Sequence, residues 1–172
     1  PHAEDVPTLI RAYEVKGYFD ELLDLLESAL GLERAHMGVF TQMGIALAKY
    51  RPERLMEYLK LYWSRSNLPQ LIKVTDKAHL WRELVFLYTK YDEPDNAALT
   101  IMEHCSDAWD HDQFKAVLPQ VANVEIYYRA LTFYLEQHPL LLNDLLTVLV
   151  KRIDHARVVR MFKKHDHDNV PL

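Results

Sequence analysis

The residues with the clearest metal-binding chemistry lie near the end of the sequence, where His165-Asp166-His167-Asp168 alternates imidazole and carboxylate groups. Imidazole nitrogens and carboxylate oxygens are common ligands of divalent metals. The sequence offers no identifiable distant ligand to complete such a site, and we interpret residues 165–172 as a frayed tail. We therefore predict no metal site.

Two other histidine clusters contain residue types that occur in catalytic or metal sites. His104 precedes Cys105, and the two could supply a base and a nucleophile, but adjacent residues of a helix do not face each other. Asp110-His111-Asp112 is better explained as the acidic start of a helix, where carboxylates complement the positive end of the helix dipole. No HExxH, CxxC or glycine-rich phosphate loop occurs. We predict no catalytic residue, no cofactor-binding residue, no cofactor and no enzymatic activity.

One charged cluster has the character of a binding surface. Lys49, Arg51 and Arg54 surround a turn at residues 50–53. Turns between stacked helices lie along one edge of the stack, so these cations are expected on an accessible ridge. The cluster is either a solubilising turn or a surface that attracts an acidic, extended or helical partner.

The composition narrows the class of protein. The 172 residues carry a formal net charge of −5, which opposes general binding to nucleic acid because that needs basic residues at the phosphates. The single cysteine, Cys105, excludes an internal disulfide and favours a reducing, cytosolic setting. No apolar run approaches the ~20 residues that span a bilayer, so direct membrane insertion is not expected. The sequence lacks an initiator Met, which suggests a piece of a longer protein.

Helical periodicity dominates the chain. Apolar residues recur three and four positions apart, as at Leu22, Leu23 and Leu26, and Trp81 is predicted to be a core residue on such a stripe. Asn67 and Asn123 have the position and chemistry of helix N-caps. We predict about 11 helices, at residues 5–16, 19–30, 33–49, 52–64, 68–75, 78–90, 94–105, 110–118, 123–137, 139–150 and 154–164.

The spacing of the turns predicts how these helices are arranged. Turn centres near Gly17, Pro52, Pro94 and Pro139 lie 35, 42 and 45 residues apart, as in arrays of helical hairpins. A single hairpin cannot cover its own apolar face, so neighbouring hairpins stack into one core. We predict an all-α fold: an α-solenoid of stacked antiparallel helix hairpins, continuous over 1–164 without an internal domain boundary.

Four long stretches resemble the clathrin heavy-chain family: GYFDELLDLLESALGLERAHMGVF (17–40), AHLWRELVFLYTKYDEPDNA (78–97), VANVEIYYRALTFYLEQHPLLLNDLL (121–146) and RIDHARVV (152–159). The resemblance covers nearly the whole chain. It implies a structural segment of the proximal leg in a three-legged coat protein. This segment is expected to lie in the cytoplasm, on the cytosolic face of coated vesicles and coated pits, where it serves vesicle-mediated transport such as endocytosis.

The resemblance also implies partners, namely clathrin light chain and neighbouring heavy-chain legs. On this view the light chain binds Lys49, Arg51 and Arg54, together with His138 at a comparable turn. Two other functions remain open at this stage. One is a peptide-binding, tetratricopeptide-like adaptor of vesicle trafficking, and the other is a helical enzyme with a dispersed site in a deep pocket.

Overall fold

The computed structural model of the chain describes residues 6–30 and 37–168, and it confirms the predicted all-α class. Twelve α-helices and no strand occur in this part of the chain. Four short 3₁₀ turns are also present: η2 (Pro52–Arg54), η3 (Trp63–Arg65), η4 (Leu118–Gln120) and η5 (Pro139–Leu141). The α-helices are α1 (Val6–Lys16), α2 (Phe19–Leu30), α3 (Met37–Tyr50), α4 (Leu55–Tyr62), α5 (Leu68–Lys77), α6 (Trp81–Lys90), α7 (Pro94–Glu103), α8 (Cys105–Ala108), α9 (His111–Val117), α10 (Val124–Gln137), α11 (Leu142–Leu149) and α12 (His155–Asp168).

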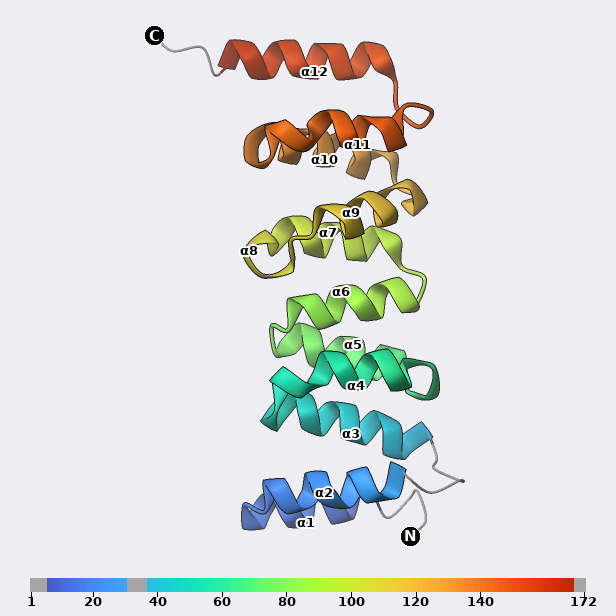
Figure 1. Ribbon diagram of the computed structural model, residues 1–172, viewed down its shortest axis with the longest axis vertical. Coiled ribbons are helices and arrows are strands. Elements are labelled where there is room, and N and C mark those ends of the chain that lie inside the picture. Colours follow the sequence, from blue (N-terminus) through green and yellow to red (C-terminus); the bar gives the residue numbers. More distant parts are fainter. Residues whose placement is uncertain (1–5, 31–36, 169–172) are drawn as a thin grey trace. The chain divides into compact units, whose positions relative to one another are not determined.

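Contacts between residues group the chain into two compact units, and the boundary in the sequence lies between Tyr91 and Asp92. The first unit contains α1 to α6 and the second contains α7 to α12, and both are drawn in Figure 1. Each unit is built from helices that follow one another along the chain. The array without a boundary over 1–164 stays a prediction.

The helix boundaries differ from the prediction at a few places. The predicted helix at 94–105 is two helices, because His104 leaves helical geometry with φ −123° and ψ 43°. The predicted helix at 52–64 begins as a 3₁₀ turn at Pro52 and becomes α-helical only at Leu55. At the other end, α12 extends to Asp168 rather than stopping at 164. Residues 5, 33–36 and 169–172 of the predicted helices and tail lie outside the described residues.

In the first unit, α3 lies between α2 and α4 and contacts both (Figure 1). Its core is almost entirely aliphatic and includes Leu22, Leu26, Leu47, Leu59 and Leu87. The α1–α2 hairpin turns at Gly17, whose φ of +75° favours glycine. Two hydrogen bonds across this turn, from Gly17 N to Glu14 O and from Tyr18 N to Tyr13 O, form a Schellman motif.

The same C-terminal motif closes α5 without a glycine. His79 adopts a φ of 59°, while the N–H groups of His79 and Leu80 donate to the carbonyls of Asp76 and Thr75. The His79 ring stacks on Trp81, with ring centroids 5.0 Å apart. Trp81 itself is only partly buried, so the prediction that it is a core residue is wrong. Its neighbours Leu84 and Val85, at 2% and 1% exposure, supply the buried stripe of α6.

In the second unit, α10 contacts both α7 and α11. Tyr134 and Phe114 are its largest fully buried side chains, and Leu131 and Leu145 pack at zero exposure. The predicted N-cap at Asn123 is confirmed, because its side chain accepts a hydrogen bond from the N–H of Glu125. This unit contains His138, a predicted partner-binding residue, and His111, which forms hydrogen bonds with Tyr134 and Asp144.

Candidate functional site

The turn between α3 and α4 brings together the three cations predicted to bind a partner. Lys49 is exposed in the last turn of α3, Arg51 follows that helix, and Arg54 ends η2. The sequence spacing thus places all three on one hairpin turn. Lys49 forms no ion pair within residues 6–30 and 37–168.

The two arginines are engaged by carboxylates of α2. Arg51 pairs with Asp20, and Arg54 Nη2 lies 3.1 Å from Glu27 Oε1. These carboxylates are seven residues apart and therefore share one face of α2. The Asp20 and Glu27 side chains are 71% and 51% exposed, so each pair lies at the surface, where solvent screens its attraction. An incoming acidic partner would have to compete with these carboxylates.

Tyr50 fixes this turn against the α1–α2 hairpin. Its hydroxyl donates to a Glu14 carboxylate oxygen, and its ring stacks on Phe19 with centroids 4.4 Å apart. Burial, reinforced by the Glu14 carboxylate, raises the pKa of Tyr50 to about 12. The phenol therefore remains a hydrogen-bond donor at neutral pH. The contacts of Tyr50 with Glu14 and Phe19 therefore fix the position of this turn on the α1–α2 hairpin.

His138, the fourth residue predicted to bind light chain, is part of an aromatic cluster. It ends α10, and its ring lies parallel to Trp109, with centroids 4.2 Å apart and an interplanar angle of 6°. Phe133 and Tyr134 also approach the His138 ring, at 5.8 and 6.1 Å between centroids. The ring is thus partly buried by packing. The feature of this turn that most clearly faces solvent is Leu140, which is 97% exposed.

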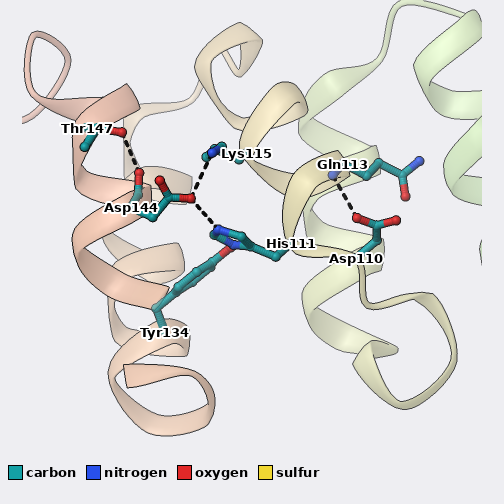
Figure 2. A network of polar contacts seen from close by, with 7 residues as sticks. All are labelled: Asp110, His111, Gln113, Lys115, Tyr134, Asp144 and Thr147. Atoms are coloured by element: carbon teal, nitrogen blue, oxygen red, sulfur yellow. Dashed lines mark hydrogen bonds and ion pairs between the residues drawn. The ribbon is translucent and has the colours of Figure 1, made fainter. Parts of the chain in front are cut away.

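A polar network centred on His111 joins three helices of the second unit (Figure 2). His111 Nδ1 lies 2.7 Å from the Tyr134 hydroxyl, and His111 Nε2 lies 2.7 Å from Asp144 Oδ2. Lys115 Nζ donates to the same Asp144 oxygen at 2.8 Å. One carboxylate of α11 therefore connects α11 to two side chains of α9, while Tyr134 of α10 contacts His111 alone.

The electrostatics of this network indicate bracing rather than catalysis. Hydrogen bonds from Lys115 and then His111 lower the pKa of Asp144, and the bond to Asp144 raises the pKa of Lys115. Burial raises the pKa of Tyr134, so its hydroxyl stays protonated. Both nitrogens of His111 are occupied, which leaves neither available to activate a nucleophile. The arrangement fixes α9 against α10 and α11.

Sequence reasoning explained only part of this network. The interpretation of Asp110 as a helix start is confirmed, because its carboxylate accepts a hydrogen bond from the N–H of Gln113 at 3.0 Å. The contacts of His111 with Tyr134 and Asp144, which are 23 and 33 residues away, were not predicted from the sequence. No local pattern specifies pairs at such separations, since they depend on how the helices pack.

The predicted metal-ligand and nucleophile candidates can be followed only where the structure describes them. Within the residues that the structure describes, no group of three or more His, Cys, Asp or Glu side chains is placed to hold a metal ion. Cys105 is a partly buried free thiol at the start of α8. None of the helices searched in this part of the chain is both long and apolar enough to cross a membrane.

A network of charged and aromatic contacts also ties α12 to α10. Both guanidinium nitrogens of Arg157 reach the Glu125 carboxylate, at 2.9 and 2.7 Å, and the guanidinium carbon lies 3.6 Å from the centroid of the Tyr128 ring. The Tyr128 hydroxyl in turn accepts a hydrogen bond from the Asp154 N–H at 2.9 Å. Asp154 and Arg157 therefore make structural contacts that attach the start of α12 to α10.

Comparison with known proteins identifies the family. A family model described as "Region in Clathrin and VPS" matches residues 1–142. The chain is 56% identical over 163 residues to the probable clathrin heavy chain 1 of Caenorhabditis elegans, covering 95% of this chain and 10% of that protein. It is 55% identical over 171 residues to the probable clathrin heavy chain of Schizosaccharomyces pombe, covering 99% of this chain and 10% of that protein.

The human protein named clathrin heavy chain 2 is similar in the same way. It is 53% identical over 163 residues, which cover 95% of this chain and 10% of the human protein. The chain thus spans about a tenth of the length of the curated relatives it matches. The family match and the extent of this identity show that the chain belongs to the clathrin heavy-chain family.

Proposed function

We propose that this chain is a structural segment of the clathrin coat, part of the proximal leg of a heavy chain. It packs beside neighbouring legs and binds light chain on the cytosolic face of coated vesicles and coated pits. The observation that carries the proposal is the sequence identity to clathrin heavy chains, which is 56% and 55% over 95% and 99% of this chain. The helical architecture agrees with it, because helices that bury their apolar faces on successive neighbours suit a structural repeat segment.

The turn at Lys49, Arg51 and Arg54 is our candidate for the light-chain surface. Exposed cations accelerate the encounter with an acidic helix and fix its register, while apolar contacts supply most of the affinity. The surface pairs with Asp20 and Glu27 can be exchanged at small cost, because exposed ion pairs contribute only about 0–1 kcal/mol. His138 contributes from the second unit as a weaker candidate.

Light-chain binding by a turn variant tests this proposal. Glutamate at positions 51 and 54 would lie beside Asp20 and Glu27, so the arginines are better changed to glutamine. The triple variant Lys49→Glu, Arg51→Gln, Arg54→Gln should retain its melting temperature. Its Kd for purified clathrin light chain should rise, and the salt dependence of binding should flatten because fewer charges face the partner.

Lys73→Glu supplies a matched control, since Lys73 is another exposed lysine of the first unit, on α5. It should leave both the Kd and its salt dependence unchanged. A folded triple variant that binds light chain as tightly as the unaltered chain would show that this turn only solubilises the hairpin. The family match favours the coat segment over the tetratricopeptide-like adaptor and over a helical enzyme.

A further inference from the structure

Among the described residues, α5, α10 and α12 each begin with a hydrogen bond to a helix much earlier in the chain. In all three the residue just before the helix donates its own backbone N–H to a side-chain oxygen. The bonds are Asn67 N to Thr41 Oγ1 at 2.8 Å, Asn123 N to Asp95 Oδ2 at 3.1 Å, and Asp154 N to Tyr128 Oη at 2.9 Å. Their separations in sequence are 26, 28 and 26 residues. The same kind of bond thus recurs at nearly the same spacing, once in the first unit and twice in the second.

Each of these three donor residues also caps its own helix. Their side chains accept hydrogen bonds from backbone N–H groups of the first turn, Asn67 from Gln70, Asn123 from Glu125 and Asp154 from Ala156. This local bond determines the residue at which the helix begins. The N–H of the cap residue itself has no partner inside the helix, so it can bond to another element.

The three acceptors all lie in the first two turns of their helices. Thr41 is on α3, Asp95 on α7 and Tyr128 on α10. Between the bonded helices the chain forms α4, the pair α8 and α9, or α11. Each later helix therefore begins beside the start of a helix one hairpin earlier. A slip of one residue would move the acceptor about 1.5 Å along the earlier helix and about 100° around it, which would break the bond.

Further contacts hold each acceptor in place. Thr41 is 2% exposed, and its hydroxyl donates to the Met37 carbonyl at 2.9 Å, which leaves its lone pairs for Asn67. The second oxygen of Asp95 accepts from the Ala122 N–H at 2.9 Å, so this carboxylate binds two successive N–H groups before α10. The Tyr128 ring packs against the Arg157 guanidinium, as described above.

We propose that these three bonds, which we call cross-helix caps, set the register of successive hairpins within each unit. Thr41, Asp95 and Tyr128 are positioning residues, because each fixes where a later helix begins relative to its own. Apolar packing is non-directional and leaves helices able to slide or rotate on one another. A hydrogen bond forms in only one alignment. The apolar stripes therefore hold the helices together, and the cross-helix caps determine which residues face each other.

Thr41→Val tests the cap in the first unit, since valine has nearly the shape of threonine but no acceptor oxygen. In deuterium exchange followed by NMR, the Asn67 amide should exchange about fivefold faster, because its hydrogen bond is lost. The Gln70 amide, which bonds to the Asn67 side chain, should keep its protection. Thr41→Ser retains the hydroxyl and should restore slow exchange at Asn67.

Thr75→Val is the matched control. Thr75 is another buried threonine of the first unit, and its hydroxyl donates to the Leu71 carbonyl at 2.9 Å, just as Thr41 donates to Met37. The control removes an equivalent bond within a helix, so exchange at Asn67 should stay as in the unaltered chain. Equal acceleration at Asn67 in both valine variants would indicate general destabilisation and would overturn the cross-helix cap.

Tyr128→Phe is an independent test in the second unit, because it removes only the hydroxyl and keeps the ring against Arg157. The Asp154 amide should exchange about fivefold faster, while the Ala156 amide, which bonds to the Asp154 side chain, should not change. Unchanged exchange at Asn67 in Thr41→Val and at Asp154 in Tyr128→Phe would show that packing alone sets the register, which would contradict the proposal. None of these measurements uses a partner, so this outcome would leave the proposed function standing.

Discussion

Trp81 shows how a residue on an apolar stripe can differ in burial from its neighbours. It begins α6, is partly buried and stacks on His79, whereas Leu84, three positions later, is 2% exposed. We expect Leu84→Ala to destabilise the chain by about 2–5 kcal/mol, because it opens a cavity in the core. Trp81→Ala should cost less than the ~3–5 kcal/mol of a fully buried tryptophan. Urea unfolding of both variants tests this ranking, and a larger loss for Trp81→Ala would contradict it.

Asp144 gives the second prediction at this scale. Lys115 and His111 lower its pKa in the folded state, so the ionised carboxylate stabilises the fold above its unfolded pKa of about 4. This stabilisation is lost as the pH falls through the lowered folded pKa. Asp144→Asn should therefore melt below the unaltered chain at pH 7 and pH 5. The difference should shrink as the pH falls below about 4, and a difference that is the same at pH 3 and pH 7 would contradict the account.

Individual residues were predictable from sequence where their role is local. The caps Asn67 and Asp110 accept hydrogen bonds from the third residue after them, so a short window contains the whole interaction. The ties of Arg54 to Glu27 and of His111 to Asp144 join helices far apart in the chain. Such pairs depend on helix packing and rotamers, which periodicity does not encode. These two pairs were therefore found only in the structure.

At the scale of the elements, Gly17 determines how α1 turns into α2. Its φ is +75°, and an added Cβ would meet no atom within 4 Å, so only backbone strain opposes a larger residue. Gly17→Ala should destabilise the hairpin by about 1 kcal/mol, since alanine is strained at positive φ. Thermal melting measures the loss. A melting temperature equal to or above that of the unaltered chain would mean that this turn relaxes into another conformation.

Most elements could be predicted because helix starts carry strong local chemistry. Pro52, Pro69, Pro94 and Pro139 all lie in the first turn of a helix or 3₁₀ segment, where a missing N–H costs nothing. Helix ends were harder to predict. The α5–α6 turn closes on His79 at positive φ, a conformation that glycine usually marks, so the sequence placed this boundary a few residues early.

At the scale of the whole molecule, the fold class and the family followed from sequence, but the binding surface did not. The clathrin match and the all-α architecture confirm the two broad predictions. The four predicted partner residues belong to two different units, with His138 packed on Trp109 and both arginines paired with carboxylates of α2. The sequence shows that the turn carries positive charge, but it does not show that Asp20 and Glu27 already pair with the arginines there.

The central prediction is that the helices form one continuous solenoid segment of a leg. Small-angle X-ray scattering of the purified chain tests it most directly, because a stack only one hairpin wide is longer than a compact domain of equal mass. A compact chain of this length has a radius of gyration of roughly 15–16 Å. We predict a clearly larger value, with a pair-distance distribution skewed to long distances. A radius of gyration within the compact range, with a symmetric distribution, would contradict the solenoid and with it the proposed role in the leg.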